Sequence, residues 1–177
     1  ANNMLLDIEL ENINQDEFQK QTRDILSQTE HLSTTIDDFR NFFKPNKNKE
    51  LVTIASVIQD AFKLMQKSFE NNGIEIRLDL QSDTQIEIYS RELMQVVLNL
   101  LKNAKEALDQ NTTISRWISV HLEETPEYLI TTICDNGGGI KKENMHKIFE
   151  PYFSTKSKKN GTGLGLYMSK VIVEKHL

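Results

Sequence analysis

The stretch DNGGGIKKENMHKIFEPYFSTKSKKNGTGLGL, from Asp135 to Leu166, decides how the rest of the chain is interpreted. It begins with DNGGG at 135–139 and ends with GTGLGL at 161–166, and these clusters hold six of the chain's seven glycines. Glycine tolerates positive φ and lets backbone N–H groups approach a phosphate closely. The second cluster leads into a predicted helix, whose free N–H groups and positive dipole end favour an anion. Two such clusters around a basic loop indicate a phosphate-binding site; two flexible turns are the alternative.

The composition excludes several classes of protein. The chain has 177 residues, enough for one compact domain plus an appendage, and a net charge of −5, so it lacks a general basic surface for nucleic acid. The one cysteine, Cys134, excludes an internal disulfide, and its apolar surroundings in the sequence predict a buried structural thiol. No apolar segment approaches the length of a membrane span, and no signal peptide is visible. Any membrane anchor of the parent protein is therefore expected outside this chain.

A long amphipathic helix is predicted between about residues 16 and 43. Its apolar and small residues are spaced alternately four and three apart, which is the seam of a left-handed bundle or coiled coil. These residues are Phe18, Thr22, Ile25, Thr29, Leu32, Ile36, Phe39 and Phe43. One apolar stripe on a long helix needs a partner, so we predict a homodimeric helical bundle. Packing of the stripe on a globular domain is the alternative.

The residues after Pro45 are typical of an α+β domain. Pro45 ends the helix, and a polar linker is predicted at 46–50. The spacing of apolar residues predicts two helices, a third after the second glycine cluster, and short strands. The first two helices are expected at 54–71 and 90–108, and the strands at 50–53, 74–80, 85–89, 114–122 and 128–134. This order predicts a two-layer sandwich, with helices on one face of a mixed sheet.

Two asparagines interrupt the apolar pattern of helix 90–108. Asn99 and Asn103 are four residues apart, so their side chains share one face of the helix. An amide oxygen is a neutral ligand suited to Mg²⁺, which takes its remaining oxygens from waters and substrate phosphates. Two amides facing solvent are the alternative for the pair alone. Beside two glycine clusters, metal binding is the better interpretation.

Asp135 ends the last predicted strand. A carboxylate at this place can accept a hydrogen bond from the exocyclic amine of adenine, whereas guanine presents an acceptor there and would be repelled. The residue therefore favours adenine, and an ordinary Asp-Asn-Gly turn is the alternative. Among the lysines of the loop, Lys156 is the best candidate for a phosphate contact, since it follows the aromatic cluster FEPYF at 149–153.

These residues match a family. The chain resembles the ATP-binding catalytic domain of bacterial sensor histidine kinases, whose Bergerat or GHKL fold is shared with gyrase, MutL and heat-shock chaperone ATPases. Over about residues 50–177 four segments are similar to the family's motifs in the family's order: LNLLKNA at 98–104 to the N box, DNGGG to the first glycine box, FEPYF to the F box and GTGLGL to the second glycine box. The segment at 32–43 is similar to the second helix of the family's dimerisation domain.

The resemblance implies a division of the chain and a reaction. Residues 1–45 would be part of a dimerisation helical hairpin, 46–50 a linker, and 51–177 an ATP-binding catalytic domain that is truncated at its C-terminus. The complete enzyme would bind Mg-ATP and transfer the γ-phosphoryl group to a histidine, for relay to the receiver domain of a response regulator. The chain would be the cytoplasmic portion of a membrane-anchored sensor.

The resemblance also assigns roles to residues. Asn103 would bind Mg²⁺, Asn99 would lie close to the phosphates or the metal, and Asp135 would hold adenine. The further nucleotide-binding residues would be Gly137, Gly139, Ile140, Lys156, Gly161, Thr162, Gly163, Leu164, Gly165 and Leu166. Related chaperone-type ATPases carry at the place of Asn99 a glutamate that activates water. An amide cannot act as that general base, which favours phosphoryl transfer over hydrolysis.

One departure from the family concerns the phosphoacceptor. The family's acceptor motif, a histidine followed by an acidic or polar residue and then a proline, is absent, and His31 has no proline nearby. The acceptor histidine is therefore expected outside this chain. Two alternatives to the kinase remain open, a GHKL-type ATPase and a non-catalytic nucleotide-sensing dimerisation module.

Overall fold

The computed structural model describes residues 16–26, 29, 33, 48–110, 115–155 and 162–175. The chain forms two compact bodies, one of Ala1–Pro45 with Ser154–Thr162 and the other of Asn46–Phe153 with Gly163–Leu177. In the first body, residues 16–26, 29 and 33 are helical, and the rest of the helix predicted at 16–43 lies outside the described residues. The side chains of Phe18 and Ile25 are 40% and 38% exposed.

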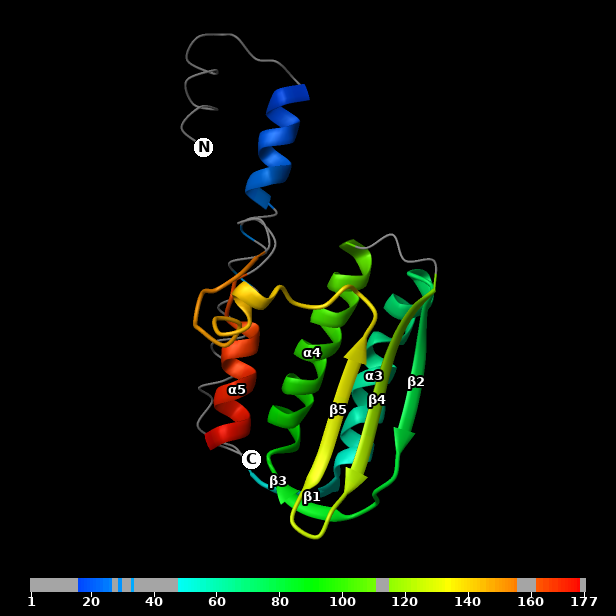
Figure 1. Cartoon of the computed structure of the whole chain (residues 1–177). Coiled ribbons are helices and arrows are strands. Elements are labelled where there is room, and N and C mark those ends of the chain that lie inside the picture. Colours follow the sequence, from blue (N-terminus) through cyan, green and yellow to red (C-terminus); the bar gives the residue numbers. More distant parts are fainter. Residues whose placement is uncertain are drawn as a thin grey trace. The chain divides into compact units, whose positions relative to one another are not determined.

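The second body is a layer of helices on a sheet, as predicted (Figure 1). A mixed sheet has the order β2-β4-β5, in which β4 is parallel to β2 and antiparallel to β5, and β1 pairs with β3 in an antiparallel ribbon. Helices α3 and α4 pack on the sheet, and α5 packs on α4. The elements in order are β1 (Glu50–Thr53), α3 (Ile54–Asn71), β2 (Ile74–Leu80), β3 (Gln85–Ile88), α4 (Ser90–Gln110), β4 (Arg116–Glu124), β5 (Leu129–Asp135), η1 (Lys142–Asn144) and α5 (Gly165–Lys175).

Local sequence fixes the ends of α3. Thr53 caps its N-terminus, because the Thr53 hydroxyl accepts a hydrogen bond of 3.0 Å from the backbone N–H of Ser56. At the C-terminus, Gly73 takes a φ of +62°, a conformation that glycine adopts without penalty. A capping threonine and a terminating glycine therefore confine the helix to the range predicted from its periodicity.

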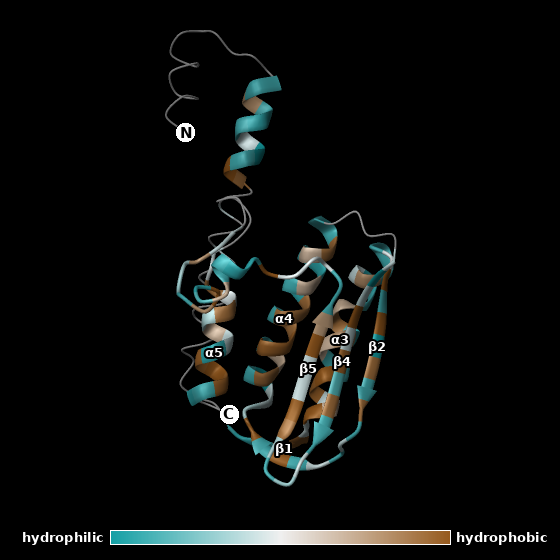
Figure 2. Ribbon diagram, in the orientation of Figure 1, coloured by the Kyte–Doolittle hydropathy of each residue, from teal (hydrophilic) through white to brown (hydrophobic). Residues whose placement is uncertain are grey.

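The core lies between the two long helices and the sheet. Apolar and polar residues alternate along β4 (Figure 2), and its Ile118, Val120 and Leu122 are 0%, 1% and 1% exposed. Burial of aliphatic side chains at this level stabilises a domain by about 1.5–3 kcal/mol each. The core cluster is Ile58, Ala61, Phe62, Phe69, Ile74, Val97, Leu101, Ala104, Leu108, Ile118 and Val120.

The opposite face of the sheet corrects one prediction. Cys134 is exposed, so the prediction of a buried thiol is wrong. In the register of β4 and β5, Cys134 pairs with Ser119, whereas Ile133 pairs with the buried Val120. Because side chains alternate between the faces of a strand, Cys134 lies on the face of the sheet that none of the described helices covers.

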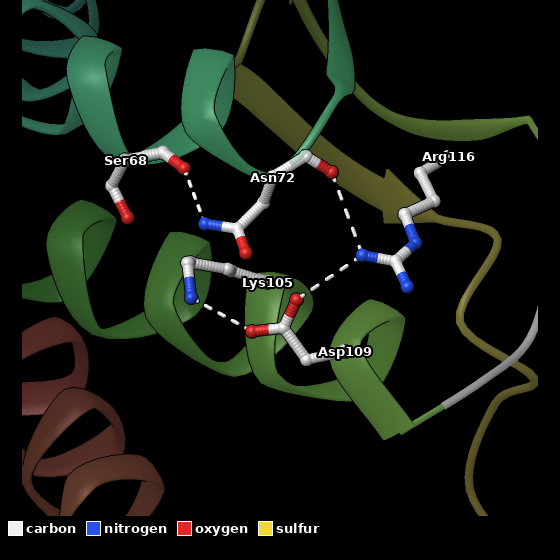
Figure 3. A network of polar contacts seen from close by, with 5 residues as sticks. All are labelled: Ser68, Asn72, Lys105, Asp109 and Arg116. Atoms are coloured by element: carbon white, nitrogen blue, oxygen red, sulfur yellow. Dashed lines mark hydrogen bonds and ion pairs between the residues drawn. The ribbon is translucent and has the colours of Figure 1, made fainter.

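A polar network joins the ends of α3 and α4 to the start of β4 (Figure 3). The Asp109 carboxylate lies 2.7 Å from Lys105 Nζ and 3.4 Å from Arg116 Nη1. The same Arg116 nitrogen donates to the carbonyl oxygen of Asn72 at 3.5 Å, and the Asn72 amide donates to the Ser68 carbonyl at 2.7 Å. These contacts hold together one end of the helical layer.

Among the described residues, no helix is both long and apolar enough to cross a membrane.

Glu124 fastens the loop between β2 and β3 to the end of β4. Its Oε2 accepts hydrogen bonds from the hydroxyls of Ser82 at 2.6 Å and Thr84 at 2.7 Å, and these bonds lower the pKa of Glu124 from its ordinary 4.5. A carboxyl with a lower pKa in the folded state stabilises the fold above the unfolded-state pKa. The stabilisation is lost as the pH falls through the folded-state pKa.

We therefore expect Glu124→Gln to lower the free energy of unfolding at neutral pH and to have a smaller effect in acid, where the wild-type carboxyl is itself protonated. Urea unfolding at several pH values measures the difference. Glu127→Gln, an exposed carboxyl nearby, is the matched control. An effect of Glu124→Gln that grows as the pH falls would contradict the assignment.

Candidate functional site

The two glycine clusters contact α4 at two points on one face. A Cβ atom added at Gly137 would lie 2.7 Å from the Cβ of Ala107, and one added at Gly165 would overlap the side-chain oxygen of Asn99. Only glycine allows such close approach. Asn99 and Ala107 are about 12 Å apart along the helix axis, with Asn103 between them on the same face. A nucleoside triphosphate can cover this span with its base at one end and its phosphates at the other.

Asp135 lies at the end of β5, on the face of the sheet that the helices cover. Its register partner on β4 is Ile118, which is fully buried, although Asp135 itself is exposed. Asp135 Oδ1 accepts a hydrogen bond of 2.8 Å from the backbone N–H of Gly137. The residue thus makes the Asp-Asn-Gly turn that the sequence left as an alternative. Within the described residues its Oδ2 has no hydrogen-bond partner, and that oxygen can accept from an amine.

Asn136 holds the first glycine cluster against β4, and sequence reasoning missed this residue. Its Oδ1 accepts from the backbone N–H of Trp117 at 2.9 Å, and its Nδ2 donates to the carbonyl of Ser115 at 2.6 Å. The side chain therefore continues the pairing of β4 and β5 beyond the end of β5. Beyond it, Gly138 and Gly139 have φ values of +97° and +74°, which favour glycine.

The second glycine cluster is joined to the aromatic cluster FEPYF. The backbone N–H of Tyr152 donates to the carbonyl of Gly163 at 3.0 Å, and a Cβ added at Gly163 would lie 2.7 Å from the backbone nitrogen of Phe153. Gly163 has a φ of +67° and Tyr152 one of +66°. The Lys170 ammonium of α5 lies 5.7 Å from the centre of the Phe149 ring. The aromatic cluster and the start of α5 therefore form one packed unit.

The two asparagines of α4 are half-buried. The amide nitrogen of Asn99 donates to the hydroxyl of Ser169 on α5 at 2.9 Å. Ser169 is 6% exposed, and the sequence did not single it out. Asn103, one turn further along α4, lies between the points where the glycine clusters contact the helix.

The remaining predicted site residues differ in their placement. Ile140 is 51% exposed after the first glycine cluster, and Leu164 and Leu166 are half-buried at the start of α5. Thr162 belongs to the first body, so it is not part of the geometry given above. Lys156 and Gly161 lie outside the described residues.

The donor set fits Mg²⁺ held together with a nucleotide. Among the described residues, no group of three or more His, Cys, Asp and Glu side chains could hold a metal ion. A divalent ion at α4 would therefore take oxygens from amides, from waters and from the phosphates of the ligand itself, which is how Mg²⁺ binds in nucleotide sites.

An acidic strand end, an amide-bearing helix face and two close-packed glycine turns are compatible with an ATP-binding α+β domain. The chain belongs to the family of histidine kinase-, DNA gyrase B- and HSP90-like ATPases, whose model matches residues 88–177. Within that family it is an ATP-binding domain of the sensor histidine kinase type, and this confirms the resemblance, the fold class and the use of ATP.

Two curated relatives illustrate the similarity. Sporulation kinase A of Bacillus subtilis is 30% identical over 158 residues, which are 86% of this chain and 25% of the relative. The C4-dicarboxylate transport sensor protein DctB of Rhizobium meliloti is 35% identical over 147 residues, which are 82% of this chain and 23% of the relative. The chain thus spans about a quarter of the length of these relatives.

The chain is also similar to solved structures of histidine kinases. The catalytic domain of histidine kinase ThkA is 26% identical with a TM-score of 0.64, and the match covers 72% of this chain and 81% of that chain. The mycobacterial sensor histidine kinase MprB is 28% identical with a TM-score of 0.61, covering 72% of this chain and 80% of that chain. ThkA in complex with the response regulator TrrA shares the fold at 19% identity, with a TM-score of 0.74, covering 99% of this chain and 49% of that chain.

Proposed function

We propose that this chain is the catalytic region of a sensor histidine kinase that transfers the γ-phosphoryl group of ATP to a histidine outside the chain, for relay to a response regulator. The observation that carries the proposal is the α4 face of Asn99, Asn103 and Ala107, which both glycine clusters approach. The relatives named sensor proteins and kinases support the reaction. The response regulator present in the ThkA complex supports the partner.

In the proposed site each residue has a separate task. The Asp135 carboxylate accepts from the adenine amine, while Gly137 and Gly139 make room for the base beside Ile140. The turn at Gly163 and Gly165, with Leu164 and Leu166, presents backbone N–H groups to the phosphates at the start of α5. Lys156, Gly161 and Thr162 are proposed as further phosphate contacts. Mg-ATP when bound supplies the phosphoryl group, with the metal ion neutralising charge on its phosphates.

Two observations favour transfer over hydrolysis. Asn99, as an amide, cannot take a proton from water. Its nitrogen is also engaged as a donor to Ser169. A GHKL-type ATPase, the alternative, would release inorganic phosphate steadily without an acceptor. Radiolabelled ATP added with an acceptor helix that carries the histidine tests the choice: formation of phosphohistidine supports the kinase, and its absence supports the ATPase or a nucleotide-sensing module.

We propose the domain division predicted from the sequence, with residues 1–45 as part of a dimerisation hairpin, 46–50 as a linker and 51–177 as the catalytic domain. Phe18 and Ile25, two residues of the predicted helical seam, are more than one-third exposed in the single chain, which supports a homodimer. We also infer that the chain acts on the cytoplasmic side of a membrane-anchored sensor, since it resembles sensor proteins.

We infer that Asn103 is the protein ligand of Mg²⁺. Asn103→Ala should remove most of the gain in ATP affinity that Mg²⁺ gives, about tenfold, because one lost ligand worth about 1.4 kcal/mol changes a binding constant by that factor. Titration calorimetry of wild type and variant, with and without Mg²⁺, measures this gain in ATP affinity. Lys102→Ala, the exposed neighbour on α4, is the control. An equal loss of affinity in both conditions would contradict a metal role.

A further inference from the structure

We propose that Ser169 is a positioning residue for the phosphate-binding end of the site and that it acts through Asn99. The two side chains form a tether between α4 and α5, and this tether sets where the second glycine cluster lies along α4. The proposal rests on the proposed function and deepens it, since it concerns how the same site holds the phosphates of ATP.

In this tether, the side chain of Asn99 from α4 contacts two successive turns of α5. Gly165 and Ser169 are four residues apart, so they share the face of α5 that packs on α4. The Asn99 nitrogen donates to the Ser169 hydroxyl at 2.9 Å, and the Asn99 oxygen lies against Gly165, where a Cβ atom would overlap it. The Asn99 amide therefore occupies the notch that the missing side chain of Gly165 leaves.

Burial makes this contact specific. Ser169 is 6% exposed, so its hydroxyl is removed from competing water. Removing the hydroxyl would leave the half-buried N–H group of Asn99 without its acceptor. An unpaired buried donor costs free energy, so we expect the Asn99 side chain to move towards water. Such a movement would withdraw the amide from the notch and free α5 to shift along α4.

The position of α5 matters for the phosphates and not for the base. The backbone N–H groups offered to the phosphates lie at the start of α5, one turn before Ser169. The adenine end of the proposed site lies at Gly137, which contacts α4 at Ala107, about 12 Å further along the helix, and Asp135 Oδ1 accepts from the Gly137 N–H. Loss of the tether should therefore weaken binding of a triphosphate while leaving binding of adenosine unchanged.

The test compares Ser169→Ala with Ser169→Thr, which keeps the hydroxyl, and with Val173→Ala as the matched control, because Val173 lies one turn further along α5 and is 52% exposed. Affinities for Mg-ATP and for adenosine are measured on the whole chain by calorimetry. We expect Ser169→Ala to weaken Mg-ATP about five- to tenfold, as loss of one hydrogen bond does, with the adenosine affinity unchanged. Ser169→Thr should retain most of the affinity, and Val173→Ala all of it.

A second measurement needs no nucleotide. The side-chain amide of Asn99, assigned in the NMR spectrum through its loss in Asn99→Ala, should shift in Ser169→Ala towards the position of exposed asparagines. Equal weakening of Mg-ATP and adenosine in Ser169→Ala, or an unmoved Asn99 resonance, would overturn the tether. Wild-type protein that binds no ATP would instead overturn the proposed function, while the resonance would still report on the tether.

Discussion

Asp135→Asn is expected to weaken ATP binding about 100-fold, and to do so equally with and without Mg²⁺. A hydrogen bond to a charged acceptor contributes about 1.5–3 kcal/mol, and the upper part of that range corresponds to this factor. The substitution also places an amide nitrogen, a donor, where the adenine amine needs an acceptor. Because the asparagine oxygen can still accept from the N–H of Gly137, the turn after β5 is kept. The loss would therefore concern the ligand rather than the fold.

Calorimetric titration of wild type and variant, in magnesium and in EDTA, measures this effect. Asp83→Asn, an exposed aspartate in the loop between β2 and β3, is the matched control and should bind ATP as the wild type does. Thermal unfolding should show Asp135→Asn close to the wild type. A loss of affinity seen only in magnesium would assign Asp135 to the metal and remove the adenine assignment.

Gly163→Ala is expected to destabilise the start of α5 and to reduce ATP affinity by more than tenfold. A non-glycine residue at a φ of +67° is strained by about 1–2 kcal/mol. In addition, the new Cβ atom would overlap the backbone of Tyr152 and lie 2.7 Å from the nitrogen of Phe153. Since backbone atoms cannot turn aside as a side chain does, the turn or α5 itself must shift, and the phosphate-facing N–H groups shift with it.

Gly73→Ala separates the two causes. Gly73 has a φ of +62°, but a Cβ atom there would meet nothing within 4 Å. Its substitution therefore measures the backbone strain alone, and it lies at the end of α3, outside the site. Urea unfolding should show a greater loss of stability for Gly163→Ala than for Gly73→Ala, and only Gly163→Ala should lose ATP affinity. Equal effects on stability with ATP binding intact would show that the close packing at Gly163 is unimportant.

Much of the fold could be predicted from the sequence because the signals are local. Helix α3 has the predicted bounds, since a capping threonine and a glycine mark its ends. Helix α4 ends at Gln110, two residues beyond the prediction, and β4 begins at Arg116 instead of residue 114. No glycine marks either of these two ends in the sequence. The apolar neighbours of Cys134 predict a buried thiol, whereas the strand register places Cys134 on the face of the sheet opposite the described helices.

The site was only partly predictable, because only some of its residues carry a local signal in the sequence. Asn99, Asn103 and Asp135 stand out as polar residues in apolar segments. Ser169 and Asn136 look ordinary in the sequence, and their importance comes from packing between distant elements. The Asn99–Ser169 hydrogen bond joins residues 70 positions apart, and no periodicity or spacing rule relates them.

The bond between Tyr152 and Gly163 has a consequence for variation in this chain. The chain leaves the second body after Phe153 and returns to it at Gly163. The hydrogen bond therefore joins the two ends of the segment between these points. Lengthening a connection whose ends are already fastened adds only about 0.6 kcal/mol of entropy for each doubling. An insertion between these two points is therefore expected to leave the stability of the sheet and its helices nearly unchanged.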